Sequence, residues 1–141
     1  MNLPILLVES NALVRQVVAL TATSLALGPV HQAASIQTAL RLLQTREFSA
    51  TILPLHSEGD EVGKQFFSLL EALRAGTTPS DPAIPVVITA SACNRDEASQ
   101  LLALNVQRVL IKPFKTRTLI DVLGEIAALT SASVSAITAL A

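Results

Sequence analysis

Five short apolar segments alternate along the chain with longer segments in which apolar residues recur every three or four positions. An uninterrupted apolar run of about four to six residues is typical of a strand covered on both faces, and the wider spacing is typical of a helix with one buried side. The predicted strands span residues 5–8, 30–34, 50–55, 86–90 and 108–111. A predicted helix follows each of them.

The predicted helices have recognisable starts and ends. Side chains that accept a hydrogen bond from a backbone N–H group stand at the starts, and glycine or asparagine stands at the ends. The expected caps are Ser10 or Asn11, Ser35 and Asn94, and the expected ends are Gly28 with Pro29, Gly76 and Asn105. The spacing places Leu13, Val14, Val17, Val18, Thr21 and Leu25 in one inward stripe of the first helix, and Ala98, Leu101 and Leu102 in that of the fourth.

The alternation of strands and helices predicts an α/β fold, in which a five-stranded parallel sheet carries helices on both faces. Functional groups of such sheets gather at the carboxyl ends of the strands. The residues at those ends that attract attention are Glu9, Ser10, Pro54, Thr89 and Lys112. The Ser/Thr/Ala-rich segment 130–141 is interpreted either as an extension of the last helix or as a linker.

Pro54 is unexpected where it stands, at the end of the apolar segment 50–55. Proline has no backbone N–H group, so within sheets it is confined to edges, strand ends and bulges. The strand end at position 54 therefore has an unusual task, or has lost a usual one.

Composition narrows the classes of function. The net charge is −1, and the chain has four Phe, no Trp and no Tyr. A nucleic-acid or anionic-membrane partner is not expected, because neither a basic surface nor a set of stacking aromatic rings is available. The single cysteine, Cys93, excludes an internal disulfide and is typical of a reducing compartment. With no basic segment before the first apolar run and no run long enough to span a bilayer, we expect a cytoplasmic protein.

The segments "ILLVES", "PVVITA" and "VLIKPF", in this order of elements, resemble the receiver domain of bacterial two-component response regulators. The resemblance covers residues 3–129, so that residues 1–129 form one receiver-like domain and 130–141 a tail. It implies a flavodoxin-like (βα)5 fold with strand order 2-1-3-4-5. It also implies a cis peptide bond between Lys112 and Pro113.

The resemblance assigns a role to each residue at the strand ends. In the family, an acidic pair after the first strand and an aspartate ending the third bind magnesium, and that aspartate accepts a phosphoryl group. Glu9 matches the first acidic position, but Ser10 stands at the second and Pro54 at the acceptor. Thr89 and Lys112 match the residues that contact the phosphoryl oxygens, whereas Val109 replaces the aromatic residue of the switch.

A pocket with one carboxylate of three lacks the hard oxygen ligands that magnesium needs and lacks the acceptor itself. We therefore predict a degenerate receiver, or pseudo-receiver, that is not an enzyme, holds no metal or cofactor and works by contact with a protein partner or effector domain. Lys112 is expected to be neutralised by Glu9, and the Thr89 hydroxyl to bond to nearby backbone.

Three alternatives remain open. The first is an atypical receiver whose acceptor has moved into the loop 56–61, which carries His56, Ser57, Glu58, Asp60 and Glu61. The second is a flavodoxin-like binder of a small ligand, although the loop after the first strand has no glycine to cradle a phosphate. The third is an enzyme that uses Glu9 and Lys112 as acid and base.

The resemblance also indicates where a partner binds. Receivers associate through the face made by the fourth helix, the fifth strand and the fifth helix. Val109, Ile120 and Val122 are apolar residues of this segment that one inward stripe does not explain. We expect them to form a contact that is constitutive, with a partner or with a second copy in a homodimer.

Overall fold

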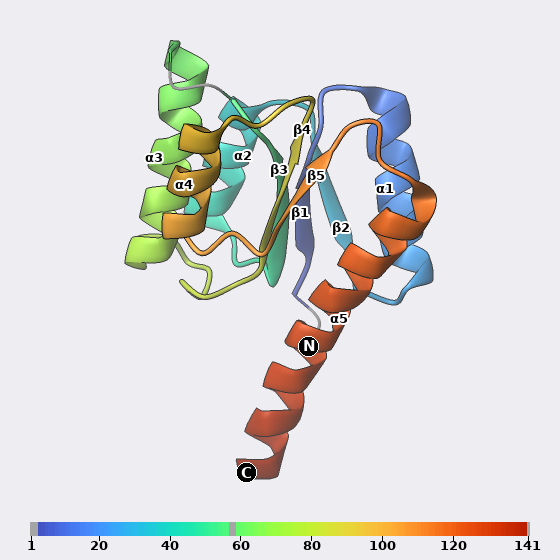
Figure 1. Ribbon diagram of the computed structural model, residues 1–141. Helices are drawn as coiled ribbons and strands as arrows, with labels where there is room; N and C mark the ends of the chain where they lie inside the picture. The colour runs from blue at the N-terminus through green and yellow to red at the C-terminus, as the bar shows by residue number, and fades with distance from the viewer. Residues whose placement is uncertain (1–2, 57–58, 141) are drawn as a thin grey trace.

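The computed structural model describes residues 3–56 and 59–140, in which five strands alternate with five helices (Figure 1). The element order is the predicted one. In chain order the elements are β1 (Ile5–Val8), α1 (Ala12–Ser24), β2 (Val30–Ala33), α2 (Ile36–Thr45), β3 (Ala50–Pro54), α3 (Glu61–Ala75), β4 (Val86–Ala90), α4 (Arg95–Ala103), β5 (Arg108–Ile111) and α5 (Thr116–Leu140).

All strand pairs are parallel and the order is β2-β1-β3-β4-β5, which confirms the predicted sheet. Ile5 of β1 is in register with Val30 of β2 on one side and with Ala50 of β3 on the other. The chain therefore moves outward from β1 to β2 and then crosses to β3. The carboxyl ends of β1 and β3 flank this switch point, where open α/β sheets place their sites.

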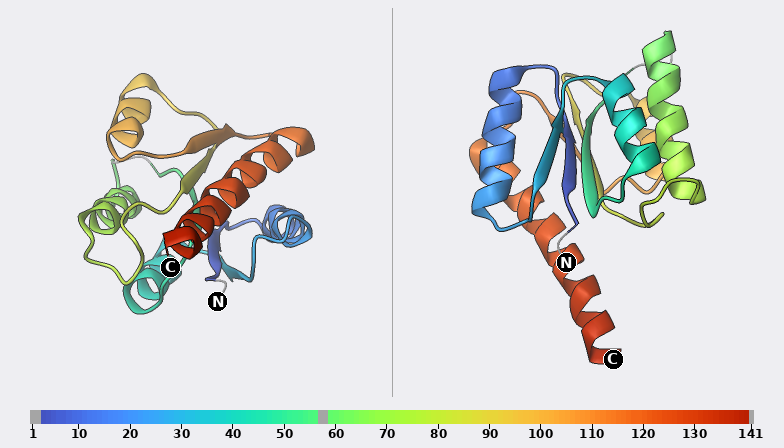
Figure 2. Two further views of the ribbon diagram at one scale, coloured as in Figure 1. Left: turned by 90° about the horizontal axis from the view of Figure 1, so that it is seen from below. Right: turned by 180° about the vertical axis from the view of Figure 1, so that it is seen from behind.

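The helices form two layers, with α1 and α5 on one face of the sheet and α2, α3 and α4 on the other (Figures 1 and 2). Successive side chains of β1 alternate between these layers. Ile5 and Leu7 pack in the cluster under α1 and α5, whereas Leu6 and Val8 pack under α2, α3 and α4. The continuous apolar strands are explained by this double cover.

Local capping accounts for most helix boundaries. Asn11, Ser35 and Asn94 each accept a hydrogen bond from the backbone N–H three residues later, as predicted for these positions. Gly76 and Asn105 adopt positive φ angles of 79° and 56° at the predicted ends. The predicted end of the first helix is wrong. α1 stops at Ser24, before Gly28, and Ala26, between these two residues, has a φ of 57°.

Four of the inward positions predicted for the first and fourth helices are exposed instead: Leu13 and Val17 of α1, and Ala98 and Leu102 of α4. Val14 and Val18 of α1 and Leu101 of α4 face the core as predicted. One side of each helix contacts the sheet, so apolar residues on its other side remain in solvent. The spacing of apolar residues did not reveal that α1 has apolar residues on two sides.

Val122 is wrong as an interface candidate. Its exposed fraction is 2%, and it packs under α5 together with Leu119, Leu123 and Ile126. Positions i, i+3, i+4 and i+7 share one side of a helix, so Val122 belongs to the inward stripe and completes it.

The last helix extends well beyond the sheet. α5 remains helical as far as Leu140, and its carboxyl-terminal part projects away from the two layers (Figures 1 and 2). None of the helices in the described part of the chain is both long enough and apolar enough to cross a membrane.

Candidate functional site

An ion pair joins the ends of β1 and β5 at the carboxyl edge of the sheet. Lys112 Nζ lies 2.5 Å from Glu9 Oε1, although the two residues are 103 positions apart in the sequence. The Glu9 side chain is 5% exposed and the Lys112 side chain is 29% exposed. The predicted neutralisation of Lys112 by Glu9 is confirmed.

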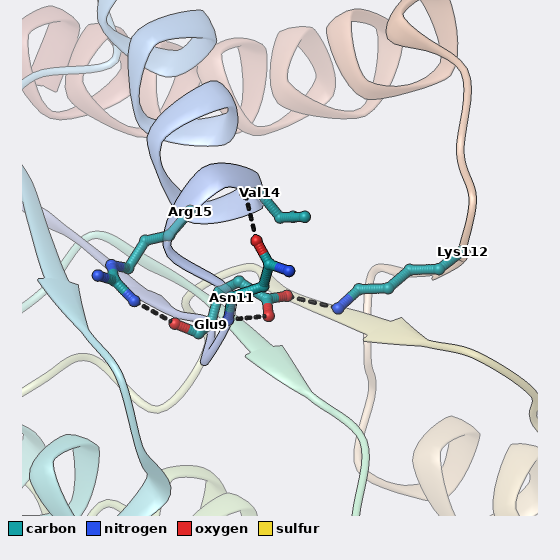
Figure 3. A network of polar contacts seen from close by, with 5 residues as sticks. All are labelled: Glu9, Asn11, Val14, Arg15 and Lys112. Carbon is teal, nitrogen blue, oxygen red and sulfur yellow. Dashed lines mark hydrogen bonds and ion pairs between the residues drawn. The ribbon is translucent and has the colours of Figure 1, made fainter.

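Glu9 is held from several directions (Figure 3). Its second carboxylate oxygen, Oε2, accepts a hydrogen bond of 2.9 Å from the backbone N–H of Asn11, and its carbonyl oxygen accepts one of 2.7 Å from the Arg15 guanidinium. Asn11 in turn caps α1 by accepting from the Val14 N–H. The carboxylate therefore lies at the start of α1, where the helix dipole also favours negative charge.

These contacts keep Glu9 ionised in spite of its burial. Burial alone would raise the pKa of Glu9, but the hydrogen bond from Lys112, the backbone N–H groups of Asn11 and Ser10 and the Lys112 charge together lower it below its ordinary value of 4.5. Both carboxylate oxygens of Glu9 are thus already in use within the protein.

The lowered pKa predicts a pH-dependent contribution to stability. A group whose pKa is lower in the folded than in the unfolded state stabilises the fold above its unfolded pKa, and this contribution is lost as the pH falls through the folded pKa. We expect Glu9→Gln to be less stable than wild type at pH 7, and the difference to shrink below the ordinary Glu value of 4.5. Urea unfolding of wild type and Glu9→Gln at several pH values measures this difference in the free energy of unfolding. A difference that does not change with pH would contradict the assigned role of Glu9.

Pro54 is the last residue of β3, the strand that pairs with β1, and it is in register with Thr89 of β4. The last pair between β1 and β3 is Leu7 with Ile52, and the N–H of Leu55 donates to Thr89 O at 2.8 Å. Because successive N–H groups of a strand alternate in direction, position 54 would donate toward β1, beyond the last paired residue. Proline is tolerated here because no ladder hydrogen bond is lost.

Thr89 differs from the prediction in one respect. Its side chain is buried, as expected, but within the described ranges Oγ1 has no hydrogen-bond partner, so the predicted bond to local backbone is wrong. In contrast, the buried hydroxyl of Thr51 in the neighbouring strand donates to Leu6 O. The Lys112–Pro113 peptide bond is cis, as the resemblance implied.

The pocket does not fit a magnesium ion. Glu9 supplies the only carboxylate of the three matched positions, and Lys112 and Asn11 already bond to its oxygens. Ser10 points to the surface, and Pro54 has no side-chain oxygen. Magnesium requires several hard oxygen ligands in an octahedral arrangement. Elsewhere in residues 3–56 and 59–140, no group of three or more His, Cys, Asp or Glu side chains is arranged to hold a metal.

The loop 56–61 is only partly described, because positions 57 and 58 lie outside the described residues. Asp60 is the N-cap of α3 and accepts a 2.8 Å hydrogen bond from Gly63 N–H, while Glu61 is the first residue of the helix. His56 contacts the edge of the Phe66 ring, and burial lowers the pKa of its imidazole although Asp60 opposes this. The Asp60 carboxylate thus has a structural task.

The remaining interface candidates differ in their exposure to solvent. Val109 is half-buried against the cluster under α4, and Ile120 is exposed on α5. Leu102 of α4 and Ile111 of β5 are also exposed on the elements of this predicted face, and neither was among the candidates predicted from the sequence. The position of Ile111 on an edge strand was available as a signal, because edge strands leave side chains in solvent.

Comparison with known proteins supports the fold. No family model and no curated protein matches the sequence. Among solved structures, a CheY-like response regulator receiver domain protein from Methanospirillum hungatei JF-1 is similar with a TM-score of 0.74 and 15% identity, covering 94% of this chain and 99% of the other.

Two further solved structures are similar over nearly their whole length. The signal receiver domain of an HD domain-containing protein from Pseudomonas fluorescens Pf-5 has a TM-score of 0.72 and 20% identity, covering 94% of this chain and 99% of that one. The chemotaxis protein CheY4 of Vibrio cholerae has a TM-score of 0.69 and 22% identity, covering 89% and 99%. This chain therefore has the receiver-domain fold.

Proposed function

We propose that this chain is a pseudo-receiver, a non-catalytic regulatory module of the cytoplasm that acts through protein contacts and without phosphorylation. The observation that carries the proposal is the Glu9–Lys112 ion pair at the carboxyl edge of the sheet, together with Pro54 at the end of the adjoining strand β3. The lysine that would contact a phosphoryl group is bonded to the one remaining carboxylate. The neighbouring position that would accept the group has no nucleophilic atom.

The Glu9–Lys112 ion pair keeps the charge of this pocket balanced at all times, so the pocket has no charge imbalance that a metal or a phosphoryl group could switch. In a pocket with three carboxylates, like charges repel one another, and a metal or a phosphoryl group changes the balance of charge. Here one carboxylate meets one ammonium, so the charges are already compensated. A module of this kind presents one surface to its partner at all times.

We place the contact with a different protein, such as an effector domain, on the face of α4, β5 and α5. Leu102, Ile111 and Ile120 expose apolar side chains there, and the Arg108–Glu125 ion pair lies on the same face with its guanidinium nitrogen 2.6 Å from the carboxylate. Apolar residues with a charged rim are typical of contacts between unlike proteins.

The proposal predicts that a small acyl-phosphate donor with Mg²⁺ leaves the protein unmodified. No carboxylate stands at position 54, and Asp60 is engaged as a helix cap. Intact-protein mass spectrometry after incubation measures the result, with a receiver domain that retains its acceptor aspartate as the positive control. A hydroxylamine-labile phosphoryl adduct that disappears in Asp60→Asn would overturn the proposal and establish a relocated acceptor.

A further inference from the structure

The outer side of α1 carries an apolar stripe that no other element in the described part of the chain covers. Leu13, Val17 and Leu20 are 71%, 46% and 63% exposed, at spacings of four and three residues. The left view of Figure 2 shows α1 at the end of its layer, with no element of the described chain beyond its outer side. Single exposed leucines are normal, but three in one helical stripe form a patch of the kind that marks association.

A groove adjoins the apolar stripe of α1. It has a volume of about 570 Å³ and lies between α1 and the segment that joins β5 to α5. Four apolar residues of α1 form one wall, Leu13, Val14, Val17 and Val18. The other wall consists of Ser91, Lys112, Pro113 and Phe114. A helix that packs on the stripe can therefore insert a side chain beside α1, as a knob enters a hole.

The charges around the stripe limit what can cover it. Arg15 is the only ionic residue of α1, and its guanidinium donates to Glu9 O. Lys112, on the groove wall, is paired with Glu9. A partner that brought charges to this face would bury them without a counter-charge, which is costly. The best complement is another uncharged apolar helix face.

The outer face of α1 is itself such a surface. The order and spacing of the residues in its stripe are nearly the same in both directions along the helix. Val17 lies four positions after Leu13 and three positions before Leu20. A leucine therefore flanks the smaller valine on each side. A two-fold axis near Val17 would set two α1 helices antiparallel, with each Leu13 against Leu20 of the second copy. Two-fold interfaces require this self-complementarity. We propose that two copies of this chain form a homodimer through the outer faces of α1.

The dimer leaves the face of α4, β5 and α5 free. That face differs because Arg108 and Glu125 form an ion pair on it. The homodimer first expected there is therefore moved to α1, and the two faces can be tested separately because each carries exposed leucine.

The first test is sedimentation equilibrium over a range of protein concentrations. We expect wild type to dimerise, and Leu13→Glu and Leu20→Glu each to raise the dissociation constant by at least about tenfold, because two charges would be buried at the contact. Leu102→Glu, at a leucine that is 77% exposed on α4, is the matched control and should leave dimerisation unchanged. Circular dichroism checks that each variant is folded.

The second test traps the contact. In a Cys93→Ser background, Val17→Cys should form a disulfide-linked dimer on mild oxidation, since the two-fold axis brings the two sulfur atoms together. Leu102→Cys should not. A protein that stays monomeric at high concentration, or a dimer lost in Leu102→Glu and kept in both α1 variants, would overturn the proposal.

Discussion

Replacing Lys112 by methionine is expected to lower the free energy of unfolding by about 3 kcal/mol at pH 7, because it leaves a buried carboxylate without its counter-charge. Glu9 is almost fully buried, and the ammonium group of Lys112 lies 2.5 Å from its carboxylate. Methionine keeps most of the length and the apolar stem of lysine, so the packing of the groove changes little. Urea-induced unfolding measures the loss.

The two partners of the pair are not equivalent. Glu9→Gln leaves Lys112, whose side chain is 29% exposed and can turn toward water, so its cost should be smaller, about 1 kcal/mol. The double variant should be more stable than Lys112→Met alone, because no uncompensated charge remains. If Lys112→Met cost no more than Glu9→Gln, the ion pair would be a surface contact of little weight.

Replacing Arg74 by methionine is expected to be the other large effect, with a loss of about 2–4 kcal/mol. The guanidinium donates to Leu104 O, Pro82 O, Ile84 O and Asn105 O, at distances of 2.8, 2.7, 2.8 and 3.1 Å. It thereby ties the end of α3 to the loop before β4 and to the turn between α4 and β5. Burial lowers the pKa of Arg74, and its charge is stabilised by carbonyl dipoles.

Arg74→Lys separates charge from geometry. An ammonium group keeps the charge but lacks the planar fork that reaches several carbonyls at once, so this variant should recover only part of the loss. Arg41→Met, at an exposed arginine of α2, is the matched control and should change stability by less than about 0.5 kcal/mol. Thermal and urea unfolding of the three variants measure the differences. Equal losses for Arg74→Met and Arg41→Met would contradict the structural role of Arg74.

The local chemistry of the sequence determined the elements and their order. The spacing of apolar residues distinguishes strands from helices and can be read directly along the chain. A cap such as Asn94 bonds to a backbone group only three residues away. Such signals need no knowledge of distant residues. The sheet order and the meeting of Glu9 with Lys112 were predictable only through the resemblance, because the contact joins residues 103 positions apart.

Tertiary structure alone decided which apolar residues face inward. Val122 packs in the core while Leu13, Val17 and Leu20 remain in solvent, although all four are apolar residues of amphipathic helices. A helix with apolar residues on more than one side does not specify which side meets the sheet; its position in the layer does. The same holds for the four carbonyl groups around Arg74, which come from two separate segments, the loop before β4 and the turn between α4 and β5.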